Sequence, residues 1–307
     1  MRSLFIGLSA VLGMLATPAL AQDDPEGKTY RVYFLGGQSN MDGYGFTKDL
    51  SAKQSETRDD IRIFTGQSIE DGTDGGGEGV WEALSPGFGA GFGVKDGANE
   101  MSDRFGPELT FGAKMSALHP EDGIAIIKFS RGGTALVHGV SGYGSWDPDY
   151  DQANRRNQYD MALTTISQAM AARDIDGDGK ADRLVPAGIV WMQGEADAFD
   201  DWSAARSYDS NLARLMGLLR AALHKDDLPI VIGQIKDSGD TAETRVMRYS
   251  REVRAAQARF VKTDRCASLV TATDGFGFID GWHYRSQDYL VLGQAFADAM
   301  GELERGC

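Results

Sequence analysis

The sequence predicts an α/β protein whose mostly parallel central sheet is covered by helices on both faces. Short apolar runs alternate with amphipathic segments along the chain, and several of the runs are apolar without interruption. Uninterrupted runs are typical of strands that are buried on both faces, as in parallel sheets. The predicted strands are residues 31–35, 61–64, 124–129, 185–192 and 229–235.

Three segments between or after these strands have the period of amphipathic helices. The apolar stripe of the first consists of Tyr208, Leu212, Leu215, Leu219 and Ala222, that of the second of Val246, Tyr249, Val253, Ala256 and Phe260, and that of the third of Tyr289, Leu292, Phe296 and Met300. Ser286 is the expected N-cap of the third helix. Alternation of strands and helices predicts helices on both sides of the sheet, with ligands at the carboxyl ends of the strands.

Residues 66–97 interrupt this pattern with eleven glycines, several acidic residues and little periodicity. We expect this stretch to contribute no core element. A loop of this length is usually functional or disordered, which favours a surface loop near the mouth of a site over a disordered tether. Nothing in the composition divides residues 22–307, which we expect to form a single domain.

The N-terminus has the features of a secretory signal peptide over residues 1–21. Arg2 supplies the positive charge, residues 4–15 are apolar, and Ala19 and Ala21 fit a cleavage site. The alternative is a retained membrane anchor. With the signal removed near Gln22, we expect a secreted protein, periplasmic or extracellular, with no membrane association.

The chain is strongly acidic, with 31 basic against 45 acidic side chains and a net charge of −14. Loss of Arg2 with the signal makes the mature chain one unit more negative. Such a surface repels phosphate backbones and anionic lipids, so nucleic acid is not an expected partner. Neutral polysaccharides meet no such repulsion.

The two cysteines, Cys266 and Cys307, can form a disulfide in an exported protein. Two free thiols are the alternative. Neither cysteine lies beside a histidine in the sequence, so a cysteine nucleophile is not indicated.

Ser39 is the candidate nucleophile. It follows the first predicted strand after Gly36 and Gly37, so a strand-to-helix turn would place its hydroxyl at the carboxyl edge of the sheet. Backbone N–H groups at the start of a helix favour developing negative charge there. The segment is not a G-x-S-x-G elbow, because Met41 stands at the second glycine position. A serine that only caps a helix is the alternative.

His283 is the candidate general base. Asp280 precedes it by three residues, so one short loop would supply both the base and the carboxylate that orients it. The alternative is a capping aspartate beside an exposed histidine. Of the other histidines, we expect His119 and His224 to be surface or capping residues, whereas His138 could line a pocket.

Two more segments follow predicted strands at the same edge of the sheet. Gly132 and Gly133 follow the third strand, and Gln193 follows the fourth. Glycine lets a backbone N–H approach a ligand closely, and the Gln193 amide is a further donor. We therefore expect these residues to stabilise an oxyanion.

The segments GGQSNM (36–41), KFSRGGT (128–134), WMQGEAD (191–197) and DGWH (280–283) resemble the conserved blocks of the SGNH hydrolase superfamily. More narrowly, they resemble the sialate O-acetylesterase-like branch, which includes the acetyl xylan esterases of carbohydrate esterase family six. The helix start at residues 105–108 also fits. The resemblance extends from about Tyr30 to Met300 and implies a three-layer, flavodoxin-like fold.

The resemblance also implies roles for individual residues. Ser39 matches the nucleophile, His283 the base and Asp280 its orienter. The N–H groups of Ser39 and of Gly132 or Gly133 match oxyanion donors, and Gln193 matches a block in which the wider superfamily has an asparagine donor. The residues expected to shape the site are Gln38, Asn40, Glu195 and Asp197. Departures are the extra Gly37 and the long 66–97 insertion, which leaves the choice of substrate open.

An acidic loop at residues 174–182 resembles the first part of an EF-hand calcium loop. Its acids lie at loop positions 1, 3, 5 and 9, with glycine at position 6: Asp174, Asp176, Asp178, Asp182 and Gly179. Val185 stands where the bidentate glutamate would be. We expect a structural calcium ion, and an acidic solvated turn is the alternative. Zinc is not expected, because the chain has no HExxH motif and no Cys/His cluster.

Aromatic residues near the motifs are candidates for stacking on sugar rings: Tyr44, Trp146, Trp282 and Tyr284. Packing in the core or at the rim is the alternative for each. Arg131 and His138 are candidates for contact with a polar group of the substrate.

The predicted function is therefore a secreted serine esterase that removes O-acetyl groups from carbohydrate, without a catalytic cofactor. Acetylated xylan, sialic acids and peptidoglycan all remain candidate substrates, and the oligomeric state is left open. The alternatives are a thioesterase or lipid esterase on the same fold, and a non-catalytic carbohydrate-binding protein.

Overall fold

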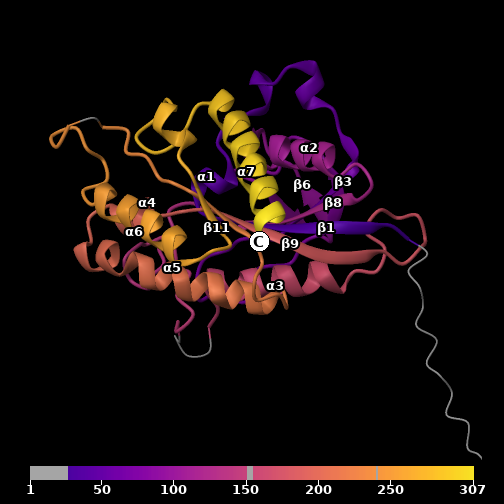
Figure 1. The fold of residues 1–307 in the computed structure, drawn as a ribbon, viewed down its shortest axis with the longest axis horizontal. Coiled ribbons are helices and arrows are strands. Elements are labelled where there is room, and N and C mark those ends of the chain that lie inside the picture. The colour runs from indigo at the N-terminus through magenta and orange to yellow at the C-terminus, as the bar shows by residue number, and fades with distance from the viewer. Residues whose placement is uncertain (1–26, 151–154, 240) are drawn as a thin grey trace, which may run out of the picture.

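The structure is a computed structural model that describes residues 27–150, 155–239 and 241–307 (Figure 1). The predicted signal peptide and the expected mature start at Gln22 lie outside the described residues. No helix in the described ranges is long and apolar enough to cross a membrane.

A seven-stranded sheet runs through the centre of the molecule. In spatial order its strands are β11 (Ala267–Val270), β10 (Ile230–Gly233), β9 (Arg183–Met192), β1 (Thr29–Gly37), β8 (Gly123–Ser130), β3 (Arg58–Thr65) and β4 (Trp81–Leu84). All neighbouring strands are parallel except β3 and β4. The predicted fold class is confirmed, and β1, β3, β8, β9 and β10 correspond to the five predicted strands.

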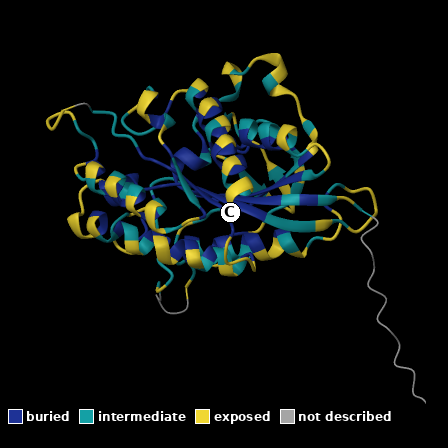
Figure 2. Cartoon of the chain, in the orientation of Figure 1, coloured by how far each residue is buried: buried dark blue, intermediate teal, exposed yellow. Residues whose placement is uncertain are grey.

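Helices cover both faces of this sheet. One layer holds α2 (Glu108–Leu118) and α7 (Ser286–Gly306), and the other holds α3 (Gln158–Ala171), α5 (Trp202–Ala222) and α6 (Ser250–Thr263) (Figure 1). The strands between the layers are buried, whereas the outer faces of the helices are exposed (Figure 2). Burial of this apolar surface on both faces of the sheet stabilises the fold.

Shorter elements lie in the connections. Two of them are single helical turns, α1 (Ser39–Asp42) and α4 (Glu195–Ala198). Two small antiparallel pairs are formed by β2 (Gly45–Phe46) with β7 (Arg104–Phe105), and by β5 (Gly93–Lys95) with β6 (Ala98–Glu100). Three 3₁₀ turns are η1 (Thr47–Asp49), η2 (Ala52–Ser55) and η3 (Ala272–Gly275).

Three expectations about local structure were wrong. The stretch 66–97 contributes strand β4 and the buried side chains of Leu84 and Phe88, so it is partly a core element. Helix α6 begins at Ser250, so Val246 and Tyr249 precede it. Ser286 is the first residue of α7, and Arg285, whose backbone is extended, is the N-cap; the Ser286 hydroxyl accepts a hydrogen bond from Phe46 N and donates one to Asp49.

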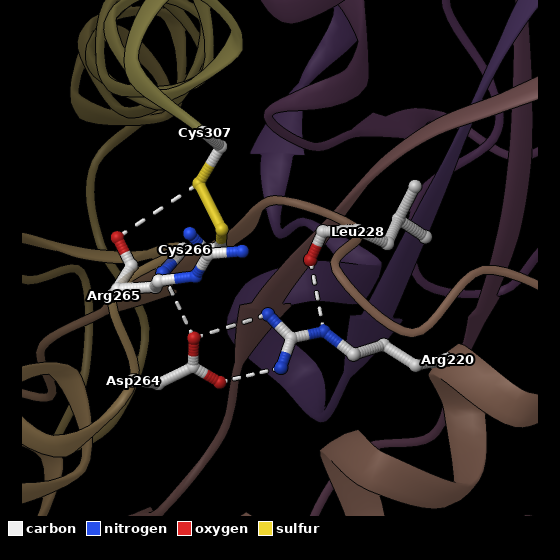
Figure 3. The surroundings of a disulfide bond; sticks show 6 residues. All are labelled: Arg220, Leu228, Asp264, Arg265, Cys266 and Cys307. Carbon is white, nitrogen blue, oxygen red and sulfur yellow. Dashed lines mark hydrogen bonds and ion pairs between the residues drawn. A yellow bond between two sulfur atoms is a disulfide. The ribbon is translucent and has the colours of Figure 1, made fainter.

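The open question about the cysteines is answered by a disulfide between Cys266 and Cys307 (Figure 3). It joins the end of α7 to the residue just before β11. The same region is held by Asp264, which accepts the Cys266 N–H at 2.9 Å and pairs with the Arg220 guanidinium. The disulfide thus ties the C-terminal helix to the edge of the sheet, and the Arg220–Asp264 ion pair ties α5 to the same segment before β11.

Candidate active site

The candidate site lies at the carboxyl end of β1, where the loops that follow β1 and its two neighbouring strands begin. Strand β8 pairs with one side of β1 and β9 with the other, and Gly37 is level with both Ser130 and Met192. The loops that follow these three strands therefore begin at the same carboxyl edge. Crevices of this kind are where open α/β sheets bind ligands.

Ser39 lies at the start of α1, directly after β1, and is almost fully buried. The turn before it depends on Gly37, whose φ is +149°. A Cβ at that position would lie 2.0 Å from the Met192 carbonyl oxygen. Glycine is thus required at Gly37 for the backbone to pass close to β9 before turning into α1.

Gly132 lies against Ser39. A Cβ built on Gly132 would be 3.4 Å from the Ser39 Cβ, so the glycine backbone faces the serine with no side chain between them. The loop is anchored to β1 by the Arg131 N–H, which donates to the Gly37 carbonyl at 3.3 Å. Gly133 has a φ of +75° and packs under the ring of Tyr143.

His283 and Asp280 form a hydrogen-bonded pair in the loop before α7. His283 Nδ1 lies 2.7 Å from Asp280 Oδ2, and the other carboxylate oxygen accepts the backbone N–H groups of Trp282 and His283. Burial favours a higher pKa for Asp280, but these hydrogen bonds outweigh it and hold the pKa below its usual value. With Nδ1 on the carboxylate, Nε2 is the ring nitrogen that remains for a partner.

Two contacts bring this loop to α1. Asn40 Nδ2 donates to the Trp282 carbonyl at 3.1 Å, and the Tyr44 ring stacks on His283 with centroids 3.6 Å apart. Within the described ranges there is no hydrogen bond between Ser39 and His283. Such contacts are often long in free enzymes and tighten when substrate binds.

Behind this edge lies a buried polar network that includes the residues predicted to shape the site. Asn40 Nδ2 also donates to Glu195 at 2.7 Å, and the Gln38 amide is 3.3 Å from the N–H groups of Gly194 and Ala196. Burial raises the pKa of Glu195, although the Asn40 contact opposes the shift. This network holds α1 and α4 together.

Gln193 is not placed as an oxyanion donor. Its side chain is fully buried, and its amide nitrogen donates to the Thr134 carbonyl at 3.1 Å and to Asp197 at 2.6 Å. Asp197 also accepts the Leu136 N–H. Burial raises the pKa of Asp197 to about 7. Gln193 and Asp197 thus fix the loop that follows β8, rather than facing Ser39.

A buried ion pair that was not predicted from the sequence supports the end of α1. Lys128 Nζ lies 2.8 Å from Glu108 Oε2, and both side chains are at most 1% exposed. The same ammonium donates to the carbonyls of Asp42 and Phe88, each at 2.8 Å. Lys128 thereby connects β8, α2, the end of α1 and the 66–97 stretch. The sequence signal that could have indicated this ion pair is a lysine within an otherwise apolar predicted strand.

Asp42 is a second residue that the sequence analysis missed. Its carboxylate accepts the Ser130 hydroxyl and lies near Gly132 and Arg131. Burial raises its pKa to about 6, although the Ser130 hydrogen bond and the charges of Lys128 and Arg131 oppose the shift. A carboxylate at the last position of α1 gives no sequence pattern by itself.

The aromatic candidates separate into two groups. Trp146 and Tyr284 are fully buried, so for these two candidates the alternative, packing in the core, is confirmed. Tyr44 is half-buried with one face against His283, and Trp282 is partly exposed beside Phe199.

The remaining polar candidates lie mostly away from Ser39. His138 is exposed and packs edge-on against Tyr150, and Arg131 donates to the Tyr143 carbonyl. His119 follows α2 and pairs with Glu304 at 2.7 Å, and His224 lies just after α5 with a φ of +55°.

The acidic loop brings three of its four predicted ligands together. Carboxylate oxygens of Asp174, Asp176 and Asp182 all lie within 4.8 Å of one another, whereas Asp178 is not part of this group. Asp174 accepts two backbone N–H groups of the loop, and Asp176 pairs with the Lys28 ammonium. The set of oxygen donors suits calcium, which would compete with Lys28 for Asp176.

Three solved structures resemble this fold. A protein from Arabidopsis thaliana has a TM-score of 0.61 at 20% identity, over 90% of this chain and 98% of its own. A carbohydrate acetylesterase from Xanthomonas citri has a TM-score of 0.58 at 17% identity, and the match covers 90% of this chain and 57% of that protein. NanS has a TM-score of 0.57 at 16% identity, and the match covers 92% of this chain and 99% of NanS. No curated protein matches the sequence.

The described chain has an α/β fold with a mostly parallel central sheet, like these structures, and its candidate catalytic residues lie at the carboxyl edge of that sheet. Residues 29–302 match the family described as "carbohydrate esterase, sialic acid-specific acetylesterase", so the chain belongs to this family. It is accordingly an ester hydrolase of the carbohydrate acetylesterase class.

Proposed function

We propose that this chain is a secreted serine esterase that removes O-acetyl groups from carbohydrate, with Ser39, His283 and Asp280 as its catalytic residues. The observation that supports this most is the hydrogen bond between Asp280 and His283, in a loop held beside the segment of Ser39. For export, N-terminal sequencing of the secreted protein should find Gln22.

The reaction follows from the proposed roles. His283 Nε2 takes the hydroxyl proton as Ser39 Oγ attacks the acetyl carbonyl, and the N–H groups of Ser39 and Gly132 stabilise the oxyanion. The imidazolium then protonates the departing sugar oxygen as its bond to the acetyl carbon breaks, which leaves acetyl-Ser39. A water molecule, deprotonated by the same histidine, attacks this ester, and the imidazolium returns the proton to Ser39 Oγ as acetate is released. Asp280 stabilises the imidazolium in both halves of the reaction.

The test is acetate release by the purified mature chain from acetylated xylan, O-acetylated sialic acid and 4-nitrophenyl acetate. We expect hydrolysis of the activated ester and of at least one acetylated carbohydrate. An acetyl thioester and a long-chain fatty acyl ester serve as comparison substrates, and a higher kcat/KM for either would contradict the proposed substrate class. Carbohydrate binding without hydrolysis of any ester would instead support a binding protein.

We also propose that the loop with Asp174, Asp176 and Asp182 binds calcium as a structural ion. If Kd is on the order of 1 mM, as in extracellular modules, 10 mM calcium stabilises the fold by about 1.4 kcal/mol and raises Tm by about 2–3 °C. Thermal unfolding with calcium, with magnesium and with a chelator measures this. The double substitution Asp174→Asn and Asp182→Asn should abolish the shift. An equal shift in that variant would disprove the site.

A further inference from the structure

A cleft between α5 and α6 plays no part in the proposed reaction. Its volume is about 360 Å³, and its lining includes Trp202, Arg206, Arg251, Glu252 and Arg259. We call it the arginine cleft. The cleft is shallow and widely open to solvent, so it suits a segment of an extended chain rather than an enclosed small molecule.

The charge of the arginine cleft is opposite to that of the whole chain. Arg206 and Arg251 make no ion pair with any described residue, whereas Arg259 pairs with Asp209 at 2.8 Å. Two neighbouring arginines, Arg248 just before α6 and Arg254 within it, are each paired with an aspartate. Two exposed guanidinium groups thus face a cleft with one carboxylate, Glu252, in a protein of net charge −14.

Aromatic rings lie both beside the candidate base and at this cleft. Trp282, next to His283, lies 5.4 Å from the Phe199 ring, and Phe199 is 51% exposed. Three residues further on, Trp202 is 49% exposed, lines the cleft and packs 5.4 Å from Tyr249. Aromatic faces that remain exposed are suited to stacking on sugar rings.

We propose that the arginine cleft is a distal subsite for a uronic acid residue of an oligosaccharide whose acetylated residue lies at Ser39. This inference rests on the proposed esterase function and narrows its substrate to acidic, acetylated oligosaccharides. Arg206 and Arg251 bind the sugar carboxylate, because guanidinium groups match carboxylates in both charge and geometry. Trp202 stacks on the ring, and Phe199 and Trp282 contact the residues between the two sites.

The positive cleft also gives an acidic protein a way to bind an anionic chain. The overall charge repels such a substrate, so a local patch of opposite charge is needed to bind and orient it. Because the contacts are exposed, their contribution should fall as ionic strength rises.

The experiment compares acetylated xylo-oligosaccharides that carry a glucuronic acid branch with the same oligosaccharides without it. We expect the wild type to have the higher kcat/KM for the branched substrate. The double substitution Arg206→Gln and Arg251→Gln should lower that value by at least about 10-fold and change the value for the neutral substrate by less than about 2-fold. Trp202→Ala should lower kcat/KM for both substrates, since stacking does not depend on charge.

The matched control is Arg173→Gln with Arg305→Gln, which removes the same charge from exposed positions after α3 and at the end of α7. Both helices end at the amino edge of the sheet, so this variant should behave as the wild type. Equal losses in the two double variants would show a general effect of net charge and overturn the proposal. Equal kcat/KM values of the wild type for branched and neutral substrates would also overturn the proposal.

Two further measurements separate this proposal from the esterase assignment. O-acetylated sialic acid carries its acetyl group and carboxylate on one sugar, so its hydrolysis should not change in the Arg206→Gln, Arg251→Gln variant. If the wild type hydrolyses no ester at all, calorimetry with the unacetylated glucuronic-acid-branched oligosaccharide decides the question. If the wild type binds this oligosaccharide and the Arg206→Gln, Arg251→Gln variant binds it at least about 10-fold more weakly, the proposed subsite is supported independently of the esterase function. If the wild type does not bind it, the proposed subsite is overturned.

Discussion

Substitution of Ser39 by alanine should lower kcat/KM for acetyl esters by about four to six orders of magnitude. The serine hydroxyl is the group that accepts the acetyl in the proposed reaction, and no neighbouring side chain replaces it. Asp42, the nearest carboxylate on α1, is hydrogen-bonded to Ser130 and lies among positive charges, so it is held away from a nucleophilic role. The residual rate then comes from binding and oxyanion stabilisation alone.

The fold should not be affected by this substitution, because the Ser39 hydroxyl makes no hydrogen bond with the rest of the described chain. Thermal unfolding of the variant checks this point. Ser203→Ala, at an exposed position near the start of α5, is the matched control and should keep full activity. A mass spectrum of wild type mixed with 4-nitrophenyl acetate should also show an acetyl adduct that Ser39→Ala lacks. Retention of activity within tenfold would remove Ser39 from the mechanism.

The sheet and the site were predictable to different degrees. Strands β1, β8 and β9 are largely buried, so their mostly apolar runs marked them in the sequence. Their common direction then placed the segments of Ser39 and Gly132 at one edge. The position of these motifs directly after predicted strands was therefore enough to predict that they form one site.

What the sequence could not predict depends on contacts between distant residues. Strand β4 has only four residues and pairs antiparallel with β3, so it shows neither a long apolar run nor clear alternation. The burial of Trp146 and Tyr284 follows from packing against other rings, such as Trp191 and Phe276. No local pattern separates a buried ring from one at the rim of a site.

The role of the Gln193 amide was also beyond local pattern. Whether this side chain faces the substrate or the interior depends on Asp197 and on the Thr134 carbonyl, which takes part in the loop after β8. A buried carboxylate such as Asp197 needs donors, and the glutamine supplies one of them. The same requirement explains why Lys128 and Glu108 are buried together, since either charge alone would be unstable there.

Substitution of Asp280 by asparagine should lower kcat by about three to four orders of magnitude while leaving the fold intact. In the wild type the carboxylate accepts the Nδ1–H of His283, so the lone pair of Nε2 is free to take the serine proton. An asparagine can instead donate its amide hydrogen to Nδ1, which moves the ring proton to Nε2 and removes the base. It also removes the negative charge that stabilises the imidazolium. Because the pKa of Asp280 lies below its usual value, that charge is present throughout the neutral and mildly acidic range.

The measurement is a comparison of kcat for Asp280→Asn with that of Asp298→Asn, which removes an exposed carboxylate from α7. The control should match the wild type. Asp280→Glu keeps the charge and should recover part of the lost activity, because a carboxylate is still available to Nδ1, although displaced by one methylene. Equal losses in the asparagine and glutamate variants would indicate that Asp280 acts mainly through its hydrogen bonds to the backbone of the loop. A loss of less than tenfold in Asp280→Asn would mean that another group orients His283, and the proposed triad would then be wrong in its third member.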